Sequence, residues 1–305
     1  MNVVALAGGV GGAKLAHGLA LRLPPEALTI VVNTGDDFEH LGLPICPDLD
    51  TVMYTLAGLA NPATGWGLAD ETWSCMAALD RLGGETWFRL GDRDLATHLE
   101  RRRRLAAGQT LTEVTQALSK ALGVGPRLLP MSDGAVRTRV QTDEGELAFQ
   151  EYFVHRQCRP RVNGFRFAVD GEARASAPVL AALEQADLIV ICPSNPFVSL
   201  GPILSLPGVR ERLAQNPGVA VTPIVGGQAL KGPAGKMLAE LGLPVSPVAV
   251  AEVYAGLVRG FVLDVVDAAL EPQIGALGLS VLVTDTVMKT EADRARLAEE
   301  VMRNW

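Results

Sequence analysis

Four glycines in five positions precede a lysine near the start of the chain, in the run Gly8-Gly9-Val10-Gly11-Gly12-Ala13-Lys14. An apolar segment, residues 3–7, comes before this run, and leucines at helical spacing follow it. The order of strand, glycine turn and helix presents backbone N–H groups and a helix N-terminus to a phosphate. Glycine permits this approach because it lacks a Cβ and readily adopts positive φ. We therefore predict a nucleotide-phosphate site formed by Gly9, Gly11 and Gly12, with Lys14 adding a positive charge.

The run matches neither of the two best-known phosphate-binding patterns. A Walker loop requires Ser or Thr after the lysine, but Leu15 follows Lys14. The dinucleotide pattern G-x-G-x-x-G requires a final glycine where Lys14 stands. The run is thus interpreted as a phosphate loop of another kind, and the alternative is a turn whose glycines serve only tight strand–helix packing.

Acidic residues crowd the expected loops, and several of them follow predicted strands. Asn33, Asp36 and Asp37 come directly after the apolar segment 28–32, and Asp50 opens a short helical segment. Carboxylates beside a phosphate loop are typical of a hard divalent cation shared with a substrate phosphate. We predict Mg²⁺ as the cofactor and Asp36, Asp37 and Asp50 as its ligands; the alternative is that these aspartates are helix caps and turn formers.

A second polar loop, residues 193–201, follows the apolar strand predicted at 188–192. Ser194 and Asn195 offer a hydroxyl and an amide that could bind a nucleotide base or phosphate, or could simply stabilise the loop. Ser132 lies in Met131-Ser132-Asp133-Gly134, at the boundary between the α/β pattern and the predicted hairpin, where it could act as a helix N-cap or contact a ligand. The sequence leaves both pairs of alternatives open.

Protein nucleophiles are disfavoured by the sequence. The four histidines have no metal-ligand spacing, and no G-x-S-x-G elbow is present. The run Arg101–Arg104 spreads around a predicted helix, so most of it should be a solvated face, with one member able to reach a substrate phosphate. These absences favour direct transfer between two bound substrates.

Composition restricts the class of protein. The 305 residues carry a net charge of −7, which argues against nonspecific binding to nucleic acid. No apolar stretch approaches the ~20 residues of a membrane span. The four cysteines are scattered without a C-x-x-C pair, and no secretory leader is evident, so we expect reduced thiols in a cytoplasmic protein.

Apolar runs alternate with helical patterns along most of the chain, which predicts an α/β fold with a Rossmann-like, doubly wound, mainly parallel sheet. Residues 1–126 and 178–305 should form the core, and residues 127–177 should form a smaller β-rich insertion containing a hairpin of 136–142 and 146–153. Further strands are expected at 3–7, 28–32, 188–192, 219–225, 245–250, 262–266 and 280–283. Helices are expected at 50–60, 95–105, 111–122, 178–185 and 292–302.

Six separated motifs, in this order and over nearly the whole chain, resemble the 2-phospho-L-lactate transferase family of coenzyme F-420 biosynthesis. They are residues 8–14, Asn33-Thr34-Gly35-Asp36-Asp37, the segment Ile45–Tyr54, Gly65-Trp66-Gly67, the segment Gly91–His98, and Pro193-Ser194-Asn195-Pro196.

The resemblance implies a specific reaction. A guanosine diphosphate activated by phospholactate or phosphoenolpyruvate meets the deazaflavin FO, whose terminal ribityl hydroxyl attacks, so that GMP leaves and F-420-0 or its dehydro form is produced. Phosphoryl-type transfer of this kind asks mainly for positioning and charge neutralisation. Family members are similar in requiring Mg²⁺ and in commonly forming homodimers.

The resemblance also implies roles for residues. Asp50 and Arg89 look like deazaflavin contacts, with Asn33 and Ser132 as neighbours, and Trp87-Phe88 could wall a flat ring. The glycine run, Ser194 and Asn195 resemble the guanylate side. Asp50 and Asp36 are the catalytic candidates, with Asp50 either holding the metal or orienting and deprotonating the attacking hydroxyl. The chain departs from the family pattern at Gly134, where relatives carry a second acidic residue, so the resemblance implies no metal role for the loop Ser132-Asp133-Gly134.

Two alternative functions share parts of this pattern. A non-catalytic regulator that binds nucleotide sugars, resembling the related gluconeogenesis-factor family, would share the glycine run and the α/β core. The segment 45–54 and the tryptophans at 66, 73 and 87 favour the transferase instead. A Rossmann dehydrogenase is disfavoured because the dinucleotide pattern is incomplete.

Overall fold

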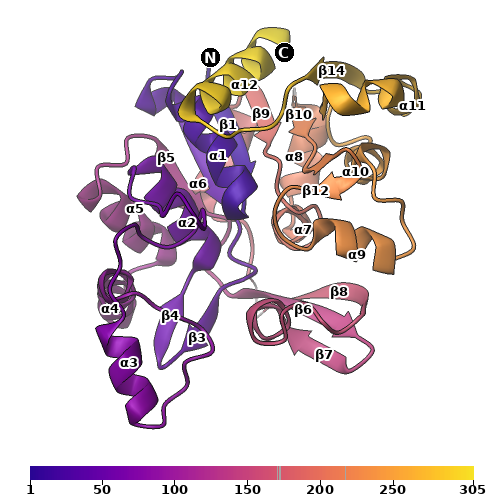
Figure 1. The fold of residues 1–305 in the computed structure, drawn as a ribbon. Coiled ribbons are helices and arrows are strands. Elements are labelled where there is room, and N and C mark those ends of the chain that lie inside the picture. The colour runs from indigo at the N-terminus through magenta and orange to yellow at the C-terminus, as the bar shows by residue number, and fades with distance from the viewer. Residues whose placement is uncertain (170, 172, 217) are drawn as a thin grey trace.

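A parallel sheet of seven strands forms the centre of the molecule (Figure 1). The computed structural model describes residues 1–169, 171, 173–216 and 218–305. The strands follow the spatial order β14-β13-β10-β9-β1-β2-β5. They are β1 (Val3–Ala7), β2 (Leu28–Val32), β5 (Arg127–Pro130), β9 (Leu188–Ile191), β10 (Gly218–Val221), β13 (Gly260–Asp264) and β14 (Ser280–Thr284).

The central strands are continuous apolar runs because both faces of the sheet are covered. Every residue of β1 and β9 is buried, and Ala5 lies opposite Ile30 on one side and Val190 on the other. Runs rich in Val and Ile are the pattern expected of a parallel sheet buried on both faces. The predicted doubly wound α/β fold is confirmed.

The direction of winding reverses between β1 and β9. From β1 the chain proceeds to β2 and then β5 on one side, and later to β9, β10, β13 and β14 on the other. Ligands of such sheets bind in the crevice outside the carboxyl ends of the strands, at the point of reversal. The loops after β1 and β9 therefore mark the place to look for a site.

Helices cover the two faces in separate sets, as the two large clusters of buried apolar side chains show. Val3, Ala5 and Ala7 point into one cluster, whereas Val4 and Leu6 point into the other. The first face carries α1 (Gly9–Ala20), α2 (Pro47–Leu56), α5 (Leu111–Ala121) and α12 (Glu291–Asn304); the second carries α6 (Ala177–Glu184), α7 (Leu200–Ser205), α8 (Val209–Gln215) and α10 (Pro247–Tyr254).

Smaller units extend from the carboxyl edge of the sheet (Figure 1). One contains β3 (Phe38–His40), β4 (Leu43–Ile45), α3 (Ser74–Arg81) and α4 (Asp92–Ala106). The other is an antiparallel sheet of β6 (Val136–Thr142), β7 (Gly145–Ala148) and β8 (Val162–Val169), with a π-helical turn, η2 (Glu151–His155). The remaining elements are η1 (Pro25–Ala27), β11 (Ile224–Val225), β12 (Gln228–Ala229), α9 (Ala234–Glu240), η3 (Val265–Leu270) and α11 (Glu271–Gly275).

Several predicted boundaries need correction. Residues 127–130 were placed in the insertion, but they form β5, whose buried leucines pair with β2 at the sheet edge. The hairpin is present, but its second arm ends at Ala148, and β6 also pairs with β8. The strand predicted at 245–250 is wrong: Ser246 caps α10, and Pro247 occupies its first turn, where proline is favoured.

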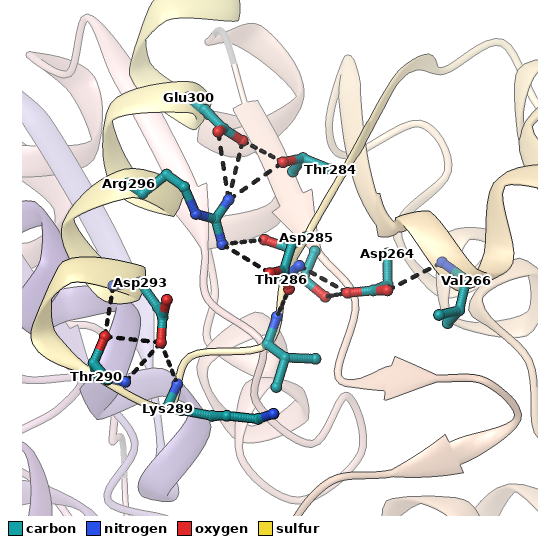
Figure 2. A network of polar contacts seen from close by, with 11 residues as sticks. Asp264, Val266, Thr284, Asp285, Thr286, Lys289, Thr290, Asp293, Arg296 and Glu300 are labelled. Atoms are coloured by element: carbon teal, nitrogen blue, oxygen red, sulfur yellow. Dashed lines mark hydrogen bonds and ion pairs between the residues drawn. The ribbon is translucent and has the colours of Figure 1, made fainter.

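A strap of residues 285–290 crosses from β14 to α12, and a polar network fixes it (Figure 2). Asp264 accepts hydrogen bonds from the backbone N–H of Thr286 at 2.7 Å and from its hydroxyl at 2.8 Å. At the other end Thr290 and Asp293 form a capping box that begins α12. Hydrogen bonds thus hold the strap at both ends, and between them it contacts α1 through the hydrogen bond from Lys14 Nζ to the Met288 carbonyl.

Within the described residues, no helix combines the length and apolar character that crossing a membrane demands. All four cysteines are free thiols, with Cys46 and Cys192 buried, Cys158 half-buried and Cys75 exposed.

Helices α1 and α12 pack so closely at Gly18 that there is no room for a side chain. A Cβ on Gly18 would lie 2.1 Å from the Arg294 carbonyl oxygen. Although alanine is favoured over glycine inside helices by about 1 kcal/mol, we expect Gly18→Ala to lower the free energy of unfolding by about 1–3 kcal/mol, the range for overpacking. Urea unfolding followed by circular dichroism measures this.

Gly275→Ala is the matched control because nothing lies within 4 Å of its Cβ. We expect its stability to equal or slightly exceed the wild type. If Gly18→Ala is as stable as Gly275→Ala, the described helix contact is incorrect.

Candidate active site

The loops after β1 and β9 are joined at the point where the sheet reverses. The Gly8 N–H donates to Ser194 Oγ at 3.1 Å, and the Ser194 hydroxyl donates to the Gly8 carbonyl at 2.8 Å. A Cβ on Gly11 would lie 2.2 Å from the Pro193 carbonyl oxygen, and one on Gly12 would lie 2.4 Å from Ser194 Oγ. Tight packing thus accounts for two of the glycines, and it brings both loops to one site.

The glycine run forms the first turn of α1 rather than a separate loop. Gly8 precedes the helix, and Gly9 begins it with φ of +60°, a conformation that favours glycine. The first N–H groups of a helix have no intrahelical acceptor. Of these, the Gly9 N–H donates to Asp48 Oδ1 at 2.8 Å. Those of Val10 and Gly11 lie in the same first turn, where the phosphate contact stays a prediction.

Asp48, which was not among the predicted site residues, links three segments. Its second oxygen accepts a hydrogen bond from Asn33 Nδ2 at 2.9 Å, and Asn33 Oδ1 accepts one from the Gly35 N–H at 2.8 Å. Burial raises the pKa of Asp48 to about 6, although the hydrogen bonds from Asn33 and Gly9 oppose the shift. Asn33, a predicted deazaflavin neighbour, is fully buried and holds this junction together.

Asp36 and Asp37 are buried beneath the β6–β8 sheet. The Thr138 N–H donates to the Gly35 carbonyl at 2.8 Å, and Gln150 Nε2 donates to the Asp36 carbonyl at 3.4 Å. A Cβ on Gly35 would lie 2.7 Å from Thr138 Oγ1, so glycine is needed for this approach. The insertion therefore closes over the turn that carries the two aspartates.

Burial raises the pKa values of both aspartates. Burial, followed by the charge of Asp48, holds the pKa of Asp36 well above its ordinary value. Burial raises the pKa of Asp37 to about 7, and the Arg137 charge opposes this shift. One carboxyl oxygen of each, Oδ1, is buried without a hydrogen-bond partner. Such orphaned oxygens would gain from a cation or a hydroxyl.

Asp50 lies two residues beyond Asp48 on α2 and belongs to a different set of contacts. Its Oδ1 is paired with Arg101 Nη2 of α4, and its Oδ2 is buried without a hydrogen-bond partner, 3.8 Å from His98 Nδ1. Burial raises its pKa, opposed by the charges of Arg101 and His98. Helix α2 thus directs Asp48 toward the glycine turn and Asp50 toward α4.

The predicted metal ligands do not form a ready-made metal site. Among the described residues, no three His, Cys, Asp or Glu side chains are grouped so that they could hold a metal ion. Magnesium is, however, usually bound by only one or two carboxylates together with water and substrate phosphates. The orphaned oxygen of Asp36, close enough to Asp48 for its charge to raise the Asp36 pKa, fits that smaller role.

Arg89 is exposed, and its guanidinium lies over the Trp73 ring, 4.2 Å from the ring centroid. Trp87 stacks on His155 of the insertion, with centroids 5.1 Å apart, and meets Phe88 edge-on at 5.8 Å. Of the aromatic pair expected to wall a ring site, Trp87 therefore links the α3–α4 unit to the insertion, and Phe88 packs on Phe38 and His40. Trp73 was not predicted as the partner of Arg89.

Three further predicted residues have hydrogen-bond partners within the protein. Ser132 is fully buried, and its Oγ accepts from the Gly134 N–H at 3.1 Å, so its hydroxyl stabilises a turn. Asn195 Oδ1 accepts from the Phe197 N–H at 2.9 Å. Lys14 Nζ donates to the Met288 carbonyl of the strap at 2.8 Å, and burial, together with Arg294, lowers its pKa.

The buried partners of Asp50 were missed because the run Arg101–Arg104 reads as a solvated face. A usable signal was the spacing of Asp94, His98 and Arg101, which are four and three residues apart and so share one side of α4. The contact of Asp48 with Gly9 depends on how α2 packs on α1, which no pattern within either segment indicates.

Similar solved structures share this fold. The chain aligns with the structure of protein BH3568 from Bacillus halodurans with a TM-score of 0.65 and 18% identity, covering 99% of both chains. A second structure of that protein, described as a member of the upf0052 family, aligns with a TM-score of 0.64 and 16% identity, over 99% of this chain and 98% of that one. At this identity the likeness concerns the fold alone.

Sequence relatives are much closer. The chain is 44% identical to a phosphoenolpyruvate transferase of Kitasatospora aureofaciens, over 98% of this chain and 97% of that protein. It is 40% identical to a 2-phospho-L-lactate transferase of Methanosarcina mazei, over 99% of both. Residues 3–299 match the family described as 2-phospho-L-lactate transferase CofD. The chain therefore belongs to the CofD family of transferases in coenzyme F-420 biosynthesis, as its motifs predicted.

Proposed function

We propose that the protein transfers a phospholactyl or phosphoenolpyruvyl group from a guanosine-diphosphate-activated donor to the terminal ribityl hydroxyl of FO. The observation that carries this proposal is the junction at the sheet reversal. There, the N–H groups at the start of α1 lie beside Asp48 and the Ser194 loop, and buried aspartates with unpartnered oxygens adjoin them. An anion-binding helix end next to spare carboxylate oxygens suits a phosphate and an attacking hydroxyl.

The bonds that change are few. The FO hydroxyl oxygen bonds to the β-phosphorus of the donor, which carries the three-carbon acid. The bond from that phosphorus to the bridging oxygen breaks, and GMP leaves with the bridging oxygen. The hydroxyl proton passes to Asp50 Oδ2, which is unpartnered and belongs to a carboxylate whose pKa is raised, as a general base requires.

Asp36, with Asp48 beside it, is the pair that we propose for Mg²⁺, with Asp37 contributing negative charge nearby. When bound, the ion would neutralise charge on the diphosphate. Asn33 and Gly35 hold Asp48 and the Asp36 turn in place, while the N–H groups of Val10 and Gly11 bind phosphate oxygens. This assignment departs from the predicted ligand set because Asp50 is already paired with Arg101.

We further propose a homodimer that works in the reducing cytoplasm. Free thiols at all four cysteines agree with a reducing setting, and the family resemblance supports the dimer. Sedimentation equilibrium tests the assembly. The nature of the acid, whether lactate, enolpyruvate or glycerate, is decided by incubating the protein with FO, Mg²⁺ and each guanylated acid and weighing the product.

The role of Asp50 gives a direct test. We expect Asp50→Asn to fold normally but to lose at least about 100-fold in turnover, because general-base catalysis typically contributes 10²–10⁴-fold. Product formation by mass spectrometry and far-UV circular dichroism provide the two readouts. Asp80→Asn, a change at an exposed carboxylate on α3, is the control and should retain full activity. Near-normal turnover of Asp50→Asn would exclude an essential carboxylate at this position.

Binding of the deazaflavin should depend on Arg89 and its aromatic support. We expect Trp73→Leu to weaken FO binding roughly two- to fivefold, the equivalent of one exposed cation–π contact, and Arg89→Met to weaken it further. Titration of FO fluorescence measures the affinity. Arg81→Met, another exposed arginine in this region, is the control. An unchanged affinity of Arg89→Met for FO would show that Arg89 does not contact FO. If the wild-type protein binds a uridine diphosphate sugar in preference to FO, the alternative function of a nucleotide-sugar-binding regulator is favoured.

Buried carboxylates make the stability of the ligand-free protein depend on pH. With its pKa raised to about 7, Asp37 keeps its proton in the folded state at pH values where the unfolded chain, with a pKa near ~3.9, has lost it. The free energy of unfolding therefore falls as pH rises toward about 7. We expect this fall to be smaller in Asp37→Asn, as measured by urea unfolding at pH 5.5, 6.5 and 8.

The comparison is made between wild type and variant because His17 and His40 titrate in the same range. Burial lowers their pKa values, which gives the opposite slope. An identical pH dependence in wild type and Asp37→Asn would contradict the raised pKa of Asp37.

A further inference from the structure

One arginine in the run Arg101–Arg104 differs from its neighbours in its burial and in the partners of its charge. Arg101 is only 2% exposed and is the largest fully buried side chain among the described residues. The side chains of Arg102 and Arg103 are 54% and 65% exposed, and they pair with Glu39 and Glu100 at the surface. A fully buried arginine is rare unless its charge is compensated.

Arg101 is compensated by contacts to both sides of its guanidinium. Its Nη2 pairs with Asp50 Oδ1, and its Nη1 donates to the Pro44 carbonyl at 3.3 Å and faces His98 Nδ1 at 3.0 Å. The charge of Asp50 raises the pKa of Arg101 against the effect of burial. Because its side chain is buried, Arg101 cannot act as a mobile cation at the surface.

The orientation of His98 follows from Arg101. A guanidinium only donates hydrogen bonds, so His98 Nδ1 must accept, and the imidazole proton must lie on Nε2. His98 Nε2 lies 3.3 Å from Asp94 Oδ2, and Asp94 Oδ1 accepts from the Tyr54 hydroxyl at 2.6 Å. Asp50 and Tyr54 of α2 are thus joined to Asp94, His98 and Arg101 of α4 in one buried network.

The network leaves one oxygen of the reacting carboxylate without a partner. Asp50 Oδ1 is held by Arg101, whereas Oδ2 is buried and lies too far from His98 Nδ1, at 3.8 Å, for a hydrogen bond. A pair that served stability alone would be expected to satisfy both oxygens, because an unsatisfied buried acceptor costs free energy. The arrangement instead fixes the rotamer of Asp50 and keeps Oδ2 for another group.

We propose that Arg101 is a positioning residue of the transfer reaction, which anchors Asp50 through Oδ1 so that Oδ2 receives the hydrogen bond of the attacking hydroxyl. Arg102, Arg103 and Arg104 have no part in this. The inference rests on the proposed function of Asp50 and adds to it a buried partner from a separate helix. Arg101 itself does not touch the substrate.

A double-mutant cycle tests the proposal. The proteins are wild type, Arg101→Met, Asp50→Asn and the double variant, with Arg101→Lys as a charge-conserving change and Arg102→Met as the matched surface control. Steady-state kcat and KM for donor and FO are measured by product mass spectrometry, and thermal unfolding is followed in parallel. Arg101→Lys keeps the fold assayable if Arg101→Met does not fold.

We expect Arg101→Met to lower kcat by 10- to 100-fold with less than a threefold change in the donor KM, and Arg101→Lys to recover part of the loss. In the Asp50→Asn background, Arg101→Met should cause no further loss of kcat, because the group it positions is already gone. The double variant should also melt at a higher temperature than Arg101→Met, since it no longer leaves a buried aspartate unpaired. Arg102→Met should behave as wild type.

Two different failures can be separated. If Asp50→Asn is inactive but Arg101→Met and Arg101→Lys keep wild-type kcat, the positioning role is wrong and the proposed function stands. If Asp50→Asn is fully active, the proposed role of Asp50 is wrong. If losses from Arg101→Met, or from Arg101→Lys where the methionine variant does not fold, are equal in both Asp50 backgrounds, Arg101 is a structural residue only.

Discussion

The carboxylate of Asp48 is the contact on which the rest of the site depends. It accepts hydrogen bonds from the first N–H of α1 and from the Asn33 amide, and so joins the segments that follow β1 and β2 to helix α2. The Ser194 loop locks against the same glycine turn from the other side of the reversal. A negative group at a helix N-terminus is electrostatically favoured. In the proposed function, the same contact places a carboxylate beside the nucleotide phosphate, so its negative charge would have to be balanced before the phosphate binds.

Burial of four aspartates is tolerated because each has a different compensation. Asp48 has backbone and amide donors, Asp50 has Arg101, and Asp37 has the charge of Arg137 nearby, whereas Asp36 has the least. Helix α2 divides the set, with Asp48 on the side of the glycine turn and Asp50 on the side of α4. In the proposed function, this division would let one side neutralise phosphate charge while the other receives a proton.

The fold extends beyond the close sequence relatives. Structures from Bacillus halodurans that are 18% and 16% identical to this chain share its fold, and a fold by itself does not determine an activity. The α3–α4 unit and the insertion extend from the carboxyl edge of the sheet. The first unit supplies Arg101 and the pair of Arg89 and Trp73, and the stack of Trp87 on His155 links it to the insertion.

Local sequence determined the parts of this protein that depend on short-range physics. Apolar runs such as Val3–Ala7 specify buried parallel strands, Thr110 and Glu113 form a capping box that begins α5, and the glycine run specifies a close approach at a helix start. The motifs also sufficed to place the chain in its family.

Tertiary structure decided which polar side chains meet. Val245–Val250 reads as a strand but becomes helical because a serine cap and proline at 246–247 begin a helix that packs on the sheet. Arg101 looks like one cation among four until α4 packs on α2. The contact between Asp50 and Arg101 joins two helices that are far apart in the sequence, so the residue pattern of neither helix predicts it.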